Sequence, residues 1–166
     1  AKGYKYIVGE GDDLYRRSLY TFWRRTVPPP SMMNFDNSAR EICSVKSNRT
    51  NTPLQALNLL NDPQFVEAAR GLAERMIKDG GETVEHQITF GHRLLLARPP
   101  DEEVLSILTR GHEDYLTTFQ AHPERANQLA NVGASGFDIS IDPVQLAAMT
   151  TIANILLNLD ETLTKE

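Results

Sequence analysis

Cysteine, tryptophan and long apolar runs are scarce in this sequence of 166 residues. A single cysteine excludes an intrachain disulfide and a zinc site made only of cysteines. No apolar run approaches the roughly 18 residues that a membrane-spanning helix needs. The sequence also lacks a phosphate-binding glycine loop, a His-Glu-x-x-His zinc motif, a Gly-x-Ser-x-Gly elbow and a Cys-x-x-Cys-His haem-attachment motif. We therefore expect no membrane span, no metal site and no cofactor in this chain.

The charges are unevenly distributed along the sequence. The whole chain has 17 basic and 22 acidic residues and a net charge of −5, which excludes a generally basic nucleic-acid binder. Residues 1–50 hold nine basic and five acidic residues, a net +4, whereas the other 116 hold eight and 17, a net −9. We favour a basic arm that packs on the acidic body of the same fold, because opposite charges attract. Alternatively, the arm faces an anionic partner or another part of a longer protein.

Proline and helix-capping residues divide the second part of the sequence into helices. Thr52-Pro53-Leu54-Gln55 is a capping box with proline at the first helical position, and Asp62-Pro63 and Asp142-Pro143 are further helix starts. Gly80-Gly81 is expected to end a helix in the left-handed conformation, and Pro99-Pro100 to end the next. Apolar residues at helical spacing predict helices over residues 53–60, 63–79, 82–97, 101–121, 124–132 and 143–159.

The first 51 residues have a weaker pattern. Aromatic residues over 15–23 fit a helix or a strand, and we favour the helix. Residues 27–30 are expected to be extended polyproline, and residues 31–51 irregular with one helical turn near 38–43. The sequence therefore predicts an all-α fold: an irregular bundle of about five or six helices with an extended basic, proline-containing N-terminal arm. Residues 1–51 form the arm and a motif loop packed on the helical body, 52–166, together one domain. Because the chain starts like the inside of a protein, we expect a fragment of a longer one.

Histidines and aspartates offer little metal chemistry. His86 and His92 lie six residues apart on one predicted helix, which is not a metal-binding spacing, so solvated or core-edge histidines are expected. Asp138 and Asp142 have a spacing that fits contact with calcium, but a loop with a capping aspartate explains the same residues and is favoured.

A dense polar segment runs from Asp36 to Asn61, ahead of and through a predicted helix start. Asp36 and Glu41 are candidate acid and base carboxylates, and Cys43 is a candidate reactive thiol because basic residues lie near it in sequence. A buried structural cysteine is favoured, since no histidine lies close in sequence to act as its base.

Three basic residues of the same segment are candidate anion ligands, namely Arg40, Lys46 and Arg49. Two arginines can clamp a carboxylate or a sulfate. Equally, they can pair with nearby carboxylates and pin the loop on the helices, and this structural role is favoured.

Several short segments resemble one known family. They are residues 16–23, 28–32, 35–36, 40–43, 49–57, 60–65, 97–100 and 156–166. The sequence resembles the planctomycete-type domain of unknown function that lies at the C-terminal end of large exported proteins, and this chain looks like the C-terminal part of that domain. The motif residues with an expected structural role are Phe35, Asn51, Thr52, Pro53, Gln55, Asn61, Asp62 and Pro63.

The resemblance implies an extracytoplasmic location, periplasmic or at the cell surface, and a parent protein with a cytochrome-c-like module whose haem lies outside this chain. It implies no activity. Ser47 and Asn48 stand where a second basic residue is expected, which weakens the anion clamp.

Three functions remain open on the sequence. We favour a non-catalytic helical docking domain whose partners are other domains of its parent protein. The first alternative is part of an enzyme that acts on an anionic polymer, such as a sulfated or acidic polysaccharide. The second is a purely structural cap, which predicts a large exposed apolar face near residues 15–23.

Overall fold

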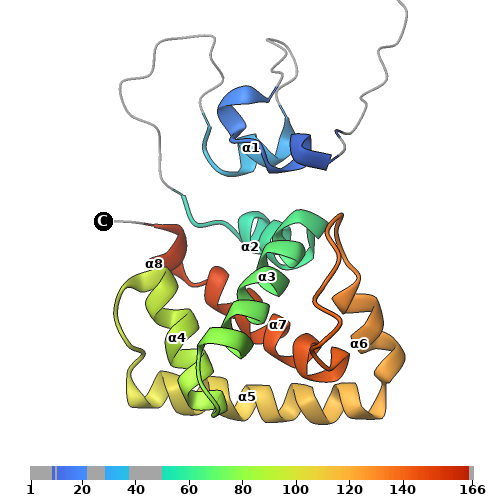
Figure 1. The fold of residues 1–166 in the computed structure, drawn as a ribbon. Helices are drawn as coiled ribbons and strands as arrows, with labels where there is room; N and C mark the ends of the chain where they lie inside the picture. Colours follow the sequence, from blue (N-terminus) through green and yellow to red (C-terminus); the bar gives the residue numbers. More distant parts are fainter. Residues whose placement is uncertain (1–8, 10, 22–28, 38–49, 165–166) are drawn as a thin grey trace, which may run out of the picture. The chain divides into compact units, whose positions relative to one another are not determined.

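The computed structural model describes residues 9, 11–21, 29–37 and 50–164 (Figure 1). The chain divides into two units, residues 1–50 and 51–166, and each is described by itself. In the first unit, the described residues form two 3₁₀ turns, η1 (Gly11–Tyr15) and η2 (Ser18–Tyr20), and one short helix, α1 (Pro30–Asn34). Phe22 and Trp23, on which the predicted 15–23 helix also rested, lie outside the described residues, as does the helical turn predicted near 38–43.

Helix α1 corrects one prediction. The sequence predicted extended polyproline through Pro30 and an irregular segment after it, but α1 begins at Pro30. Pro29 has the extended conformation, with ψ of 127°, and residues 27 and 28 lie outside the described part of the chain. Proline fits the first helical position because its fixed φ is helical. The N–H that proline lacks would have no acceptor inside the helix at this position. The backbone N–H groups of Met32 and Met33 both donate to the Pro29 carbonyl, which closes the first turn.

The described part of the second unit, Asn51 to Thr164, consists of helices and the loops that connect them. Six helices have 8 to 20 residues, and a single-turn helix follows them. Their starts and ends lie within two residues of the predicted ones, and no residue that the structure describes is in a strand, so the all-α prediction is confirmed. The helices are α2 (Pro53–Asn61), α3 (Pro63–Asp79), α4 (Val84–Leu96), α5 (Glu102–Ala121), α6 (Pro123–Ala130), α7 (Pro143–Leu157) and α8 (Asp160–Leu163).

The helix starts are fixed by side-chain caps. Thr52 Oγ1 accepts a hydrogen bond from Gln55 N at 3.3 Å, and Gln55 Oε1 accepts one from Thr52 N at 2.9 Å, which completes the predicted capping box. Asp62 accepts from the second residue of α3 at 2.9 Å, and Asp142 from the third residue of α7 at 3.1 Å. These bonds satisfy backbone donors that have no partner inside the helix.

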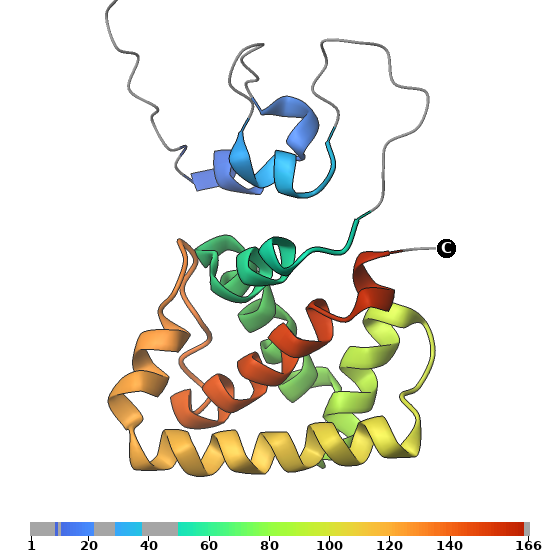
Figure 2. The same ribbon diagram turned by 180° about the vertical axis from the view of Figure 1, so that it is seen from behind.

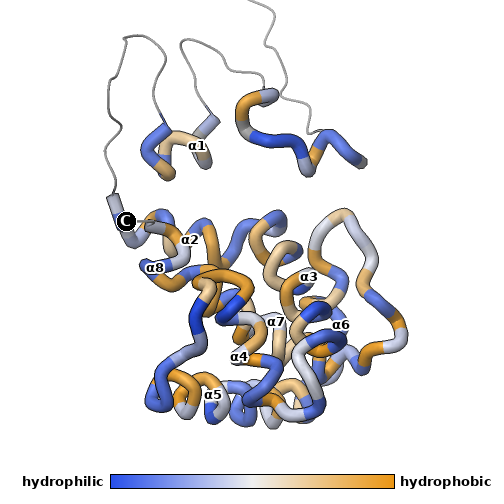
Figure 3. Tube along the Cα trace, turned by 60° about the vertical axis from the view of Figure 1, so that its left-hand side comes forward, coloured by the Kyte–Doolittle hydropathy of each residue, from blue (hydrophilic) through white to orange (hydrophobic). Residues whose placement is uncertain are grey.

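Helix α7 is the centre of the body. It packs against α3, α5 and α6 more than against any other element, and Figure 2 shows it crossing between them. Because it is enclosed, it is apolar on nearly all sides. The surrounding α5, by contrast, alternates between hydrophilic and hydrophobic residues along its length (Figure 3). The buried residues of α7 are Leu146, Ala147, Ala148, Met149, Thr150, Ile152, Ala153 and Leu156.

Two helix ends use left-handed backbone. Helix α3 ends at Gly80, which is right-handed, and the left-handed residue is Gly81, with φ of 100°. Helix α4 ends at Ala97 with φ of 58°, directly before Arg98-Pro99. Proline at 99 disfavours helical angles at Arg98, so the chain turns at the alanine before it.

Candidate functional site

Asp36 lies in the first unit, two residues after α1, with φ of 57°. Its carboxylate Oδ2 accepts hydrogen bonds from Thr50 N and Thr50 Oγ1, both at 2.7 Å. The two bonds link Asp36 to Thr50, 14 residues further along the chain. This carboxylate therefore accepts from two neutral donors of one threonine, and its role as an acid or base stays a prediction.

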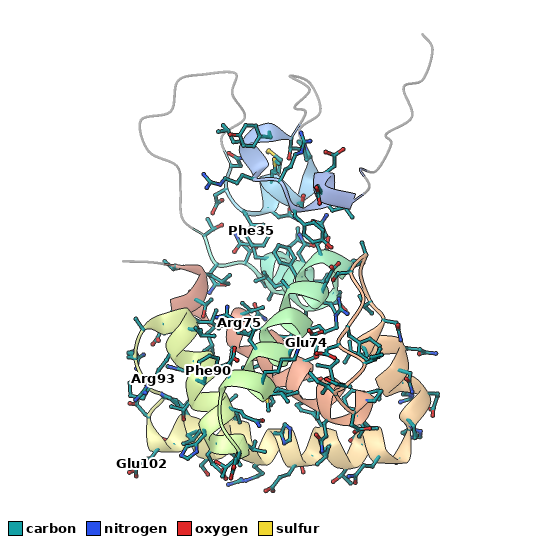
Figure 4. The ribbon with its side chains drawn as sticks, viewed as in Figure 1. Phe35, Glu74, Arg75, Phe90, Arg93 and Glu102 are labelled. Atoms are coloured by element: carbon teal, nitrogen blue, oxygen red, sulfur yellow. The ribbon has the colours of Figure 1, made fainter. Side chains whose placement is uncertain are left out.

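The other candidate residues for catalysis and anion binding lie outside the described residues. They are Arg40, Glu41, Cys43, Lys46 and Arg49. The acid/base pair, the thiol and the anion clamp therefore stay predictions. Phe35 is described: it follows α1 as its C-terminal cap, and its backbone N–H donates to the Met32 carbonyl (Figure 4).

One motif residue of the second unit, Asn51, lies at a corner formed with α8 and the segment after α4. Asn51 Nδ2 donates to Asp160 Oδ1 at 2.7 Å, and Arg98 pairs with Glu161 at 2.5 Å. Segments that resemble the family at 49–57, 97–100 and 156–166 thus converge on α8. Both side chains of the Arg98–Glu161 pair are about half exposed, so this ion pair adds little stability. The corner holds the start of α2 and the end of α4 against the C-terminal segment.

Helix α2 has an apolar outer face. Its inner face buries only Gln55 and Leu59. Leu54, Leu57 and Leu60 are spaced three residues apart and are 50%, 57% and 43% exposed. Three leucines at this spacing lie on one side of a helix, and we call them the α2 leucine stripe. The outside of α2 is therefore more apolar than its inside, and no residue of α2 is charged.

The end of α2 is joined to the core by a polar contact. Asn154 Nδ2, on α7, donates to the carbonyl of Leu60 at 3.4 Å. Asn61 Nδ2 donates to the Leu57 carbonyl at 2.8 Å, within the helix. Asp62 then ends α2 and caps α3, so this predicted motif residue serves two helices.

A buried arginine holds the loop between α6 and α7. Arg70, on α3, is 2% exposed. It donates to the Ala130 carbonyl at 3.2 Å and to Ser135, through the carbonyl at 2.8 Å and through Oγ at 2.7 Å. These carbonyl and hydroxyl oxygens satisfy the terminal guanidinium donors of Arg70, which are costly to bury without acceptors.

Glu67, one turn before Arg70, holds the same loop from its other side. Its carboxylate accepts from the backbone N–H of Ala134 at 2.8 Å and of Ser135 at 3.0 Å, and from Ser135 Oγ. Gly133 has φ of 99°, and a Cβ there would lie 2.1 Å from Glu67 Oε2. Glycine is thus favoured at this position for two reasons: its φ is one that other residues rarely adopt, and the Glu67 side chain leaves no space for a Cβ. We call Glu67, Arg70, Gly133 and Ser135 the α3–loop clamp, which the sequence analysis missed.

Lys78 and Asp138 tie the far end of this loop to α3. Their ion pair measures 2.5 Å, and Asp138 Oδ1 also accepts from Ser140 N at 2.9 Å. The Lys78 ammonium and the Ser140 donor hold the pKa of Asp138 well below its usual range, and the same bond raises the pKa of Lys78. Asp142 caps α7. Both aspartates considered for calcium thus have structural partners, and no group of three potential metal ligands gathers among the described residues.

Two histidines are buried in the helical body. His92 Nδ1 lies 2.8 Å from the Arg98 carbonyl, so this nitrogen carries the proton and donates it. Burial lowers the pKa of His112, and the neighbouring Glu113 opposes that shift. His86 and His122 are exposed. Among the described residues, no helix is both long and apolar enough to cross a membrane.

Comparison with known proteins places the chain in a family. A profile described as PSD1, protein of unknown function (DUF1553), matches residues 2–111, which is more than half of the chain. The chain belongs to this family. The resemblance found in the sequence is thereby confirmed at the level of the family. The PSD1 match includes Asp36, the capping box, the α2 leucine stripe and Arg98, and it ends within α5. No curated protein and no solved structure matches the chain.

Proposed function

We propose that this PSD1 chain is a non-catalytic helical docking domain of a larger exported protein. The observation that carries the proposal is the α2 leucine stripe, because three leucines at helical spacing face solvent on a helix that buries only two residues. A contiguous exposed apolar patch often marks an interaction site, whereas single scattered apolar residues on a surface do not.

The energetics favour covering this face. Full burial of one leucine side chain is worth about 1.5–3 kcal/mol. Leu54, Leu57 and Leu60 are each about half exposed. Covering each one with a partner therefore contributes a substantial part of this burial free energy to the complex. The capping box and the Asn51–Asp160 bond hold the start of the helix, so little ordering of α2 is needed on binding.

The location is proposed from the resemblance. An extracytoplasmic parent protein with a cytochrome-c-like module offers other domains as the partners of the stripe. The haem then belongs to the parent protein, and this chain contributes a surface rather than ligands.

A structural cap is the second candidate. Tyr15, Leu19 and Tyr20 are exposed in the first unit, which supports the apolar face that a cap requires. The enzyme alternative has no described observation in its favour: Asp36 is engaged by Thr50, and its other residues lie outside the described part of the chain.

A matched pair of variants tests the docking function. Leu57, on α2, and Ile107, on α5, are 57% and 59% exposed. Leu57→Ser is expected to weaken association with the rest of the parent protein about tenfold, as for a central interface residue, and Ile107→Ser to leave it unchanged. Calorimetric titration of both variants measures this. Equal effects of the two substitutions, or none, contradict docking through α2.

A further inference from the structure

The surroundings of the α2 leucine stripe indicate the chemistry of its partner. We infer, on the basis of the proposed docking function, that the stripe accepts a basic amphipathic helix. The inference rests on three features of the described residues: the length of α2, its hydrogen bonding and the acidic residues at its two ends.

The length of α2 fits a short partner helix. Nine residues span about 13 Å at 1.5 Å per residue, and the exposed leucines occupy two turns of that length. Leucines three residues apart form a ridge of the kind that packs into the groove of another helix. A partner with apolar residues over two to three turns covers the stripe.

The backbone of α2 selects a helix over an extended strand. Strand addition requires unpaired N–H and C=O groups along an edge. In α2, the capping box satisfies the first donors, and the Asp62 N–H bonds the Asn58 carbonyl at its end. Recognition must therefore take place through side chains, as in helix–helix packing.

The charges at the two ends of α2 select a basic partner. The helix itself is uncharged, Asp62 follows it directly, and Asp160 is bonded to Asn51 just before its start. Residues 51–166 carry a net charge of −9. Lysines or arginines beside the apolar face of a partner helix are attracted by the carboxylates next to the two ends of α2, whereas an acidic helix is repelled.

Two synthetic peptides test the inference on the full chain. Both are helical with the same leucine face, and one has lysines beside that face while the other has glutamates. By fluorescence anisotropy at low salt, the lysine peptide is expected to bind at least about tenfold more tightly, with a difference that shrinks as salt is added. Leu57→Ser is expected to lower the affinity for the lysine peptide about tenfold, and Ile107→Ser to leave it unchanged.

A second pair of variants isolates the charges. Asp62→Asn and Asp160→Asn keep a side-chain oxygen for the cap and for Asn51 while removing the charge. The double variant is expected to lose most of the preference for the lysine peptide while still binding both peptides. An unchanged preference overturns the assignment to these two carboxylates.

Other occupants give distinguishable results. Equal binding of the two peptides, or binding of neither, overturns the basic-helix inference. Concentration-dependent dimerisation that Leu57→Ser abolishes, without a preference for lysine, identifies a second copy as the occupant and also overturns it. If association with the rest of the parent protein remains sensitive to Leu57→Ser, the docking function stands while this inference falls.

Discussion

Backbone strain at the scale of single residues is clearest at Ala97. A φ of 58° puts a non-glycine residue in the left-handed region at the end of α4. This conformation costs an L-residue about 1–2 kcal/mol. Pro99 disfavours helical angles at Arg98, so the helix cannot continue past Ala97. The strain at Ala97 is therefore a consequence of the local sequence.

Replacing Ala97 by glycine is expected to stabilise the protein. Ala97→Gly removes the steric cost but adds chain entropy to the unfolded state, so we expect a gain of about 0.5–1 kcal/mol. Ala68→Gly, at an exposed site inside α3, is the control and is expected to lose about 1 kcal/mol. Urea unfolding measures both. A loss at Ala97 as large as at Ala68 contradicts the strain assignment.

Acid is expected to destabilise the protein through His112. Burial lowers its folded pKa below the ordinary value of 6.5, so the unfolded chain binds the proton more readily. The stability that it contributes is therefore fully present above about pH 6.5 and is lost as the pH falls toward the folded pKa.

The His112 effect is measured by the unfolding free energy between pH 7.5 and pH 5, in steps of about half a unit. His112→Gln is expected to flatten the slope below pH 6.5, because it removes the buried imidazole. Equal slopes in the native protein and in His112→Gln contradict this source of pH dependence.

At the scale of elements, the start of α2 depends on its capping box. Thr52→Ala removes the side-chain acceptor for Gln55 N and is expected to cost about 1 kcal/mol. Thr52→Ser keeps a hydroxyl and is expected to cost much less. Thermal unfolding of both variants measures the difference. If serine and alanine are equally destabilising, the cap does not stabilise α2.

The α3–loop clamp is expected to be a major source of stability. Arg70→Leu leaves Glu67 partly buried without its cation and removes three hydrogen bonds to the loop, so we expect a loss of about 3–5 kcal/mol. Arg75→Leu, at an exposed site of the same helix (Figure 4), is expected to change stability by less than about 0.5 kcal/mol. Denaturant unfolding that finds equal effects contradicts the clamp.

The helices could be predicted because their signals are local. Thr52-Pro53, Asp62-Pro63 and Asp142-Pro143 each place a cap and a proline within a few residues, and all three open helices. The clamp joins Arg70 to Ser135, which are 65 residues apart, and only its Glu67–Arg70 spacing is visible locally. A contact of that kind is set by tertiary packing rather than by spacing in sequence.

At the scale of the whole molecule, the described motif residues fix local structure. Asp36, Asn51, Thr52 and Asp62 each make a hydrogen bond that fixes a turn or a helix end. The α2 leucine stripe could not be identified from the sequence, because α2 is apolar on both sides and its pattern does not tell which side packs inward. The two sides of α2 are distinguished only by the structure, in which Gln55 and Leu59 are buried.

Side-chain accessibility of the stripe in the parent protein is the most direct test of docking. Hydroxyl-radical footprinting compares Leu54, Leu57 and Leu60 in this chain alone and within the whole parent protein, with Ile107, about as exposed as Leu57, as an internal reference. We expect the three leucines to become protected in the parent protein while Ile107 reacts at the same rate in both. Equal reactivity of the leucines in the two samples contradicts a docking role for α2.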